Sequence, residues 1–138
     1  MSNQTKMGEA RIKIIAMPKN TNAAGNVFGG WILSQIDLAG STAARELAPE
    51  RVVTISFKEV IFKEPVFVGD MVTCYAKIVD VGKTSITTEV NVVVERFSND
   101  NAVICVHVTS ATVVYVSVDR AGNKKLIDPE LKKLRGWA

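Results

Sequence analysis

The chain has 138 residues, enough for one folded domain with a substantial core but too few for two independent ones. Hydrophobic residues make up 47% of it and charged residues 22%, a balance that is typical of a globular protein and excludes a disordered one. The net charge is +3, and the lysines and arginines are scattered except in the tail, so we expect no nucleic-acid partner and favour a small phosphorylated ligand.

Two cysteines, Cys74 and Cys105, lie in alternating apolar segments without metal-ligand spacing. We therefore expect two buried free thiols and no metal site, as is typical of a reducing compartment. The first residues show no basic region followed by an apolar core, and no apolar run approaches the roughly 20 residues of a membrane span. These features predict a cytoplasmic protein without a membrane partner.

The chain alternates between strand and helix patterns in a simple order. Residues 10–16 predict a strand, and a loop from Pro18 to Gly25 follows it. Apolar residues then recur at the helical period from about residue 28 to residue 47, and Pro49 ends this helix. Four further strands are predicted, the last three forming an antiparallel meander with tight turns: residues 52–66, 71–81, 84–97 and 102–118.

This order predicts an α+β fold in which an antiparallel sheet wraps around one long helix. In the strand 84–97, alternate residues are expected to face the helix, namely Ile86, Thr88, Val90, Val92 and Val94. The other set is expected to face outward, namely Ser85, Thr87, Glu89, Asn91 and Glu95. A short helix is predicted after Asp128, with Pro129 in its first turn. We expect a single domain over residues 1–138, with its core at about 10–120 and a tail at 121–138.

One acid, Asp37, lies near the middle of the predicted long helix. Burying an ionised carboxylate is costly unless partners or water compensate, so Asp37 is a surface residue, a hydrogen-bonded structural residue or part of a site. The segment from Asn20 to Gly40, with Asn26, Gly29-Gly30 and Asp37 in it, resembles the opening of the hotdog-fold acyl-CoA thioesterases, especially their small bacterial YciA-like branch. The likeness continues through residues 51–54, 62–70 and 82–86.

The resemblance implies that two subunits pair into one continuous sheet, with active sites at their interface, and that paired dimers form assemblies such as hexamers. It further implies hydrolysis of acyl-CoA to a free carboxylic acid and coenzyme A, with no cofactor besides the coenzyme A of the substrate. Two other functions remain open. One is a non-catalytic acyl-CoA sensor, and the other is a hotdog hydratase or dehydratase, although Phe28 stands where some such relatives carry histidine.

Thioester hydrolysis needs an activated water or a nucleophile, and donors for the oxygen that gains negative charge. The backbone N–H groups of Gly29, Gly30 and Trp31 in the first helical turn lack intrahelical acceptors and are candidate donors. Asp37 is the candidate general base or nucleophile. Seven residues of helix span roughly 10 Å, so Gly30 and Asp37 of one subunit cannot both contact the same carbonyl group. The two residues of one site must therefore come from different subunits.

In the family, the residue that matches Asn26 of the partner subunit faces the catalytic acid, so Asn26 is a candidate for orienting water or the thioester. For the phosphates of coenzyme A, the turn Lys83-Thr84-Ser85 offers a cation, hydroxyls and amides, although a solvated turn is an equal alternative. Arg51, Arg120 and the tail lysines are lesser candidates. The single histidine, His107, has no metal or triad partners in the sequence and is expected to be structural.

Overall fold

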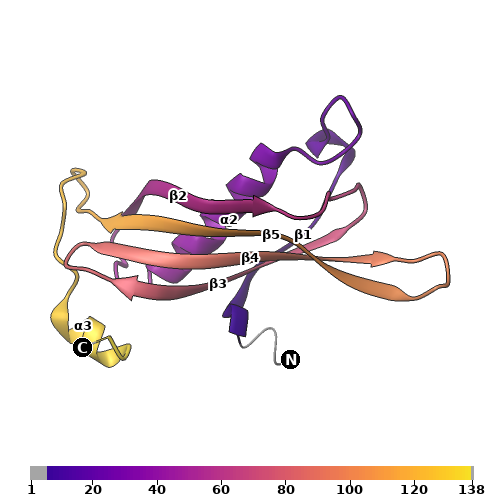
Figure 1. Ribbon diagram of the computed structural model, residues 1–138. Helices are drawn as coiled ribbons and strands as arrows, with labels where there is room; N and C mark the ends of the chain where they lie inside the picture. The colour runs from indigo at the N-terminus through magenta and orange to yellow at the C-terminus, as the bar shows by residue number, and fades with distance from the viewer. Residues whose placement is uncertain (1–5, 138) are drawn as a thin grey trace.

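The computed structural model describes residues 6–137 and contains one antiparallel sheet in the strand order β1-β3-β4-β5-β2 (Figure 1). The meander of β3, β4 and β5 is confirmed, and β1 and β2 form the two edges of the sheet. The strands are β1 Glu9–Ile15, β2 Val52–Phe62, β3 Met71–Val81, β4 Ser85–Phe97 and β5 Val103–Ser117. A short 3-10 helix, η1 Pro18–Asn20, lies in the loop after β1.

The central helix α2, Gly29–Ala44, crosses one face of the sheet and contacts all five strands (Figure 1). It ends three residues before the predicted boundary, because the backbone tightens into a turn that carries the buried side chain of Leu47. The helix turns small or aliphatic residues toward the sheet, which allows close packing of the two layers. These buried residues are Ile32, Ile36, Ala39, Gly40, Ala43 and Ala44.

The predicted alternation of β4 is confirmed on its inner face, where all five expected residues are fully buried. The outer face departs from the prediction at Asn91, which is only 7% exposed. The neighbouring strand β5 places His107 against it, with His107 Nε2 2.9 Å from Asn91 Oδ1. A cross-strand hydrogen bond therefore buries a side chain that the alternation assigned to solvent.

The predicted end of β2 at residue 66 is wrong, since the strand stops at Phe62. Residues 63–70 form a loop. An ion pair between Arg96 and Asp70 closes this loop, with 2.7 Å between Nη2 and Oδ2. Arg96 also donates to the carbonyl of Pro65, and Asp70 accepts from the amide of Phe67. Strand β4 thus anchors the loop that lies beside the start of α2.

The cysteine prediction is correct for Cys74 and wrong for Cys105, which is exposed. Cys105 lies at the start of β5, in the hairpin formed with β4 that projects from the sheet beyond α2 (Figure 1). Val103 and Ile104 beside it are also exposed, since no second layer covers this part of the hairpin.

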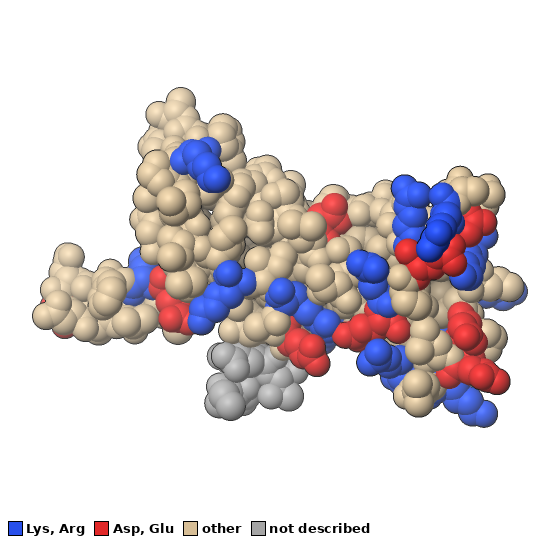
Figure 2. Space-filling model, turned by 180° about the vertical axis from the view of Figure 1, so that it is seen from behind, with Lys and Arg blue, Asp and Glu red and all other residues tan. Residues whose placement is uncertain are grey.

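The predicted tail helix is confirmed as α3, Pro129–Leu134, and the side chain of Asp128 accepts a hydrogen bond from Glu130 N at its start. The tail packs against the turn between β3 and β4, where the amide of Ile127 donates to the carbonyl of Lys83. Figure 2 shows positive and negative side chains interspersed at this end of the molecule, whereas the projecting hairpin is largely uncharged. Within residues 6–137, no helix is long and apolar enough to cross a bilayer.

Candidate active site

Asp37 is half-buried on the side of α2 that meets β2 and β5. Its Oδ1 accepts a hydrogen bond of 2.7 Å from Thr54 Oγ1 and lies 3.1 Å from the hydroxyl of Tyr115. Among the residues that the structure describes, none donates to Oδ2. The carboxylate is therefore held by one oxygen, and its other oxygen remains available for a ligand or water.

Tyr115 is fully buried beneath α2. Its hydroxyl lies 2.7 Å from the backbone carbonyl oxygen of Asp37, in addition to its contact with the side chain. Burial, and then the neighbouring Asp37 carboxylate, raise the pKa of Tyr115 well above its ordinary value, so the phenol stays protonated and donates. Sequence reasoning missed Tyr115 and Thr54; the available signals were a tyrosine in an apolar strand and the family-like segment 51–54.

The start of α2 is open, as expected from the sequence. Phe28 occupies the N-cap without a side-chain hydrogen bond to the helix, and the first amide bonded to a helical acceptor is that of Ile32, which donates to Phe28 O. Gly29 and Gly30 are exposed and Trp31 is half-buried. This turn therefore presents unpaired N–H groups and the positive end of the helix dipole to an anionic oxygen.

Asn26 and Gly29 line a common cavity of about 350 Å³, together with Phe62 at the end of β2. Asp37 is not part of its lining. One protomer thus carries two separate halves of the predicted site: Asn26 with the helix start at one end of β2, and Asp37 with Thr54 near the other end. Both halves border the same edge strand.

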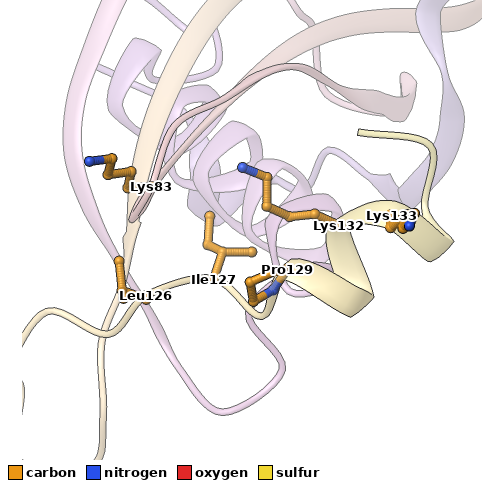
Figure 3. A pocket seen from close by; sticks show the side chains of 6 residues that line it. All are labelled: Lys83, Leu126, Ile127, Pro129, Lys132 and Lys133. Carbon is orange, nitrogen blue, oxygen red and sulfur yellow. The ribbon is translucent and has the colours of Figure 1, made fainter. Parts of the chain in front are cut away.

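Among the residues predicted to contact coenzyme A, Lys83 lines a larger cavity of about 600 Å³ beside the tail. Figure 3 shows Ile127 between Lys83 and Lys132, with Lys133 farther along α3. The complete lining is Lys83, Leu126, Ile127, Pro129, Lys132 and Lys133. The structure thus brings Lys83 together with the tail lysines.

The other predicted contacts, Thr84, Ser85 and Arg51, lie outside the lining of this cavity. The carbonyls of Thr84 and Ser85 accept backbone hydrogen bonds from Ser117 and Gly82. Arg51 is exposed and donates to the carbonyl of Arg120 at 3.4 Å. Their contacts within the chain are those of a folded turn and a strand end.

His107 lies near Lys63 as well as Asn91, with 3.2 Å between Lys63 Nζ and Nδ1. Burial, and then the charge of Lys63, lower the pKa of His107, which favours the neutral ring with its proton on Nε2 toward Asn91. These contacts support the structural role expected for it. In the described part of the chain, no three His, Cys, Asp or Glu residues gather in a metal-binding cluster.

Comparison with known proteins agrees with this architecture. Residues 24–96 match the model of the thioesterase superfamily. The acyl-CoA thioester hydrolase YciA of Salmonella typhimurium is 40% identical, over 89% of this chain and 92% of its own length. A hexameric hotdog-fold thioesterase of Campylobacter jejuni is 61% identical with a TM-score of 0.91, covering 94% of this chain and 98% of that one. A hexameric thioesterase from Yersinia pestis is 40% identical with a TM-score of 0.81, covering 88% and 96%.

The chain therefore belongs to the thioesterase superfamily, and within it to the YciA-like branch of hotdog-fold acyl-CoA thioesterases. The family and the fold inferred from the segment Asn20 to Gly40 are both confirmed.

Proposed function

We propose that the protein hydrolyses the thioester of acyl-coenzyme A to a free carboxylic acid and coenzyme A. The observation that carries this proposal is a carboxylate, Asp37, held by one oxygen on the same helix whose uncapped start presents free amides. These are the two components that acyl transfer to water requires, namely a base or nucleophile and donors for the oxyanion.

In the proposed reaction, the thioester carbonyl lies against the amides of Gly29, Gly30 and Trp31. Asp37 removes a proton from a water molecule, and the resulting hydroxide adds to the carbonyl carbon. The tetrahedral intermediate then breaks its carbon–sulfur bond, and the thiolate of coenzyme A takes up the proton. Direct attack by Asp37 through an anhydride is the alternative that we disfavour. Neither route needs a metal ion or a further cofactor.

We propose that two subunits complete each site by pairing along β2. This edge strand exposes four large apolar side chains, an unusual surface for an unpaired edge: Ile55, Phe57, Ile61 and Phe62. Antiparallel pairing of β2 about a twofold axis sets its Thr54 end opposite the partner's Phe62 end. Asp37 of one protomer then faces the open helix start and Asn26 of the partner subunit.

The hexameric state of the solved relatives supports the further proposal that three such dimers assemble in this protein. For the coenzyme A moiety, the cavity beside the tail combines the cations of Lys83, Lys132 and Lys133 with an apolar floor. This combination suits a phosphorylated nucleotide, whose phosphates need positive charge and whose base needs an apolar surface.

The test is the release of free thiol from a panel of acyl-CoAs by the wild type and by Asp37→Ala and Asp37→Asn. We expect both variants to assemble normally and to lose roughly 100-fold or more in kcat. Wild-type rates in the variants would reject the role of Asp37. Tight binding of acyl-CoA by the wild type without thiol release would instead identify a sensor, and addition of water to an enoyl-CoA would identify a hydratase.

A further inference from the structure

Two hydroxyls contact Asp37. That of Thr54 donates to the carboxylate, and that of Tyr115 lies within reach of two acceptors, the backbone carbonyl oxygen and the carboxylate of Asp37. A phenol has one proton, so Tyr115 can donate to the backbone carbonyl of Asp37 at 2.7 Å or to Oδ1 at 3.1 Å, but not fully to both. Both acceptors belong to Asp37, so the backbone and the side chain of this residue contact the same buried hydroxyl in the core.

The hydroxyl of Tyr115 has a fixed position because other side chains pack around the tyrosine. Tyr115 is fully buried in β5, so its ring has no room to change rotamer. The hydroxyl fits into a space left by Gly40, one turn after Asp37 on α2, because a Cβ at residue 40 would collide with the hydroxyl oxygen. Thr88 Oγ1 borders the same space and donates to the carbonyl of Val113. Glycine at position 40 therefore permits this close approach of a tyrosine to the helix.

The electrostatics favour a donor role for this phenol. The charged group that faces it is the Asp37 carboxylate, and burial with this carboxylate keeps the phenol neutral. A neutral hydroxyl that donates to a carboxylate stabilises its ionised form, which is the form that can accept a proton from water.

We propose that Tyr115 is a positioning residue for thioester hydrolysis, whose hydroxyl orients the Asp37 carboxylate while Gly40 provides the space for that hydroxyl. This inference rests on the proposed role of Asp37. Thr54 donates to Oδ1 and Tyr115 lies within reach of it, whereas no described residue donates to Oδ2, so Oδ2 is the oxygen left for a water molecule.

The test is Tyr115→Phe, assayed by kcat/KM against pH on an assembly of verified size and secondary structure. We expect kcat/KM at pH 7 to fall by roughly tenfold, because the carboxylate of Asp37 is held less well. We also expect the acidic limb of the pH profile of kcat/KM to move up by roughly one pH unit, because a hydrogen bond to a charged acceptor is lost. KM should change little, because the hydroxyl does not touch the substrate. An unchanged acidic limb would overturn the inference, even if stability fell.

Thr88→Val is the matched control, since it removes a buried hydroxyl that borders the same space but bonds to Val113 and not to Asp37. We expect its acidic limb to coincide with that of the wild type. A shift as large as that of Tyr115→Phe would assign the effect to packing and reject a specific role for the phenol. In an Asp37→Asn background, Tyr115→Phe should cause no further loss of the residual rate, and a further tenfold loss would also reject it.

If Tyr115→Phe does not assemble, the same question can be asked with the hydroxyl retained. The chain has two tyrosines, so Tyr75→Phe protein made with 3-fluorotyrosine carries a single fluorinated phenol at position 115. The fluorinated phenol is a stronger hydrogen-bond donor than tyrosine, so the acidic limb of the pH profile should lie at lower pH than in unlabelled Tyr75→Phe protein. Coincident limbs in the two proteins would overturn the inference. Retention of wild-type activity by Asp37→Asn would be a failure of the proposed function itself, which none of these tyrosine variants can mimic.

Discussion

Thr54 Oγ1, near the start of the edge strand β2, donates a hydrogen bond of 2.7 Å to Oδ1 of Asp37 in the central helix. This contact links the strand proposed to form the dimer with the carboxylate proposed to perform the reaction. The proposed dimer strand and the proposed catalytic carboxylate are therefore joined by one side chain.

Thr54→Val should lower kcat/KM roughly tenfold, because the carboxylate loses a hydroxyl donor while the volume of the side chain is kept. Thr54→Ser retains the hydroxyl and should keep most of the activity. Thiol release by the two variants, at equal concentrations of verified oligomer, checks this. Equal activity of the valine and serine variants would contradict a role for the hydroxyl.

Coexpression of Asp37→Ala with Asn26→Ala should restore activity that neither variant has alone. In the proposed dimer, each site takes Asp37 from one subunit and Asn26 from the other. A dimer of the two variants therefore has one site with both defects and one intact site. Random pairing makes about half of the dimers mixed, so about a quarter of all sites are intact. The measurement is thiol release from doubly tagged, purified assemblies. No recovery in verified mixed dimers would mean that each site lies within one protomer.

Lys83→Ala should raise KM for acyl-CoA roughly fivefold with little change in kcat, because the lysine is proposed to bind phosphate away from the reacting carbonyl. For an acyl-pantetheine substrate, which lacks the nucleotide, KM should stay unchanged. Lys19→Ala, an exposed lysine outside the cavity lining, is the control. An equal rise in KM for both substrates would reject the proposed phosphate contact.

Arg96→Met should lower the free energy of unfolding by about 3 kcal/mol, since it leaves the carboxylate of Asp70, whose side chain is 4% exposed, without its partner. The comparison is Lys13→Met, which breaks an exposed pair of 4.0 Å with Glu95 and should cost less than about 1 kcal/mol. Urea denaturation at a fixed protein concentration measures both. Similar costs for the two variants would show that the loop 63–70 does not depend on the buried pair.

A neutral thiol reagent should modify Cys105 quickly and Cys74 slowly in the native protein at pH 8. Burial raises the pKa of Cys74 from its ordinary value of 9.0 to about 12, which makes its thiolate roughly 1,000-fold rarer. The Cys74 thiol remains protonated below pH 9 and ionises only as the pH approaches about 12. Mass spectrometry of labelled Cys105→Ser protein checks this, and rapid single labelling of that variant would contradict it.

The sequence by itself determined the family and the order of the helices and strands, although not every boundary. Strand and helix periods are local, so the helix near residues 28–47, the inner face of β4 and the tail helix could all be predicted from spacing. The order of elements and the Asn26-to-Asp37 segment then sufficed to identify the fold and the ends of the candidate site.

Only the tertiary structure decided which side chains meet. Tyr115 lies 78 residues from Asp37 along the chain, and Asn91 is buried by His107 because the register between β4 and β5 sets them together. The exposure of Cys105 likewise follows from the register, which pairs it with Glu95 on the face of the sheet that points away from α2. Such contacts depend on strand register and on the packing of distant elements, and local periodicity carries no information about either. The partners of Asp37 are therefore known only from the folded chain.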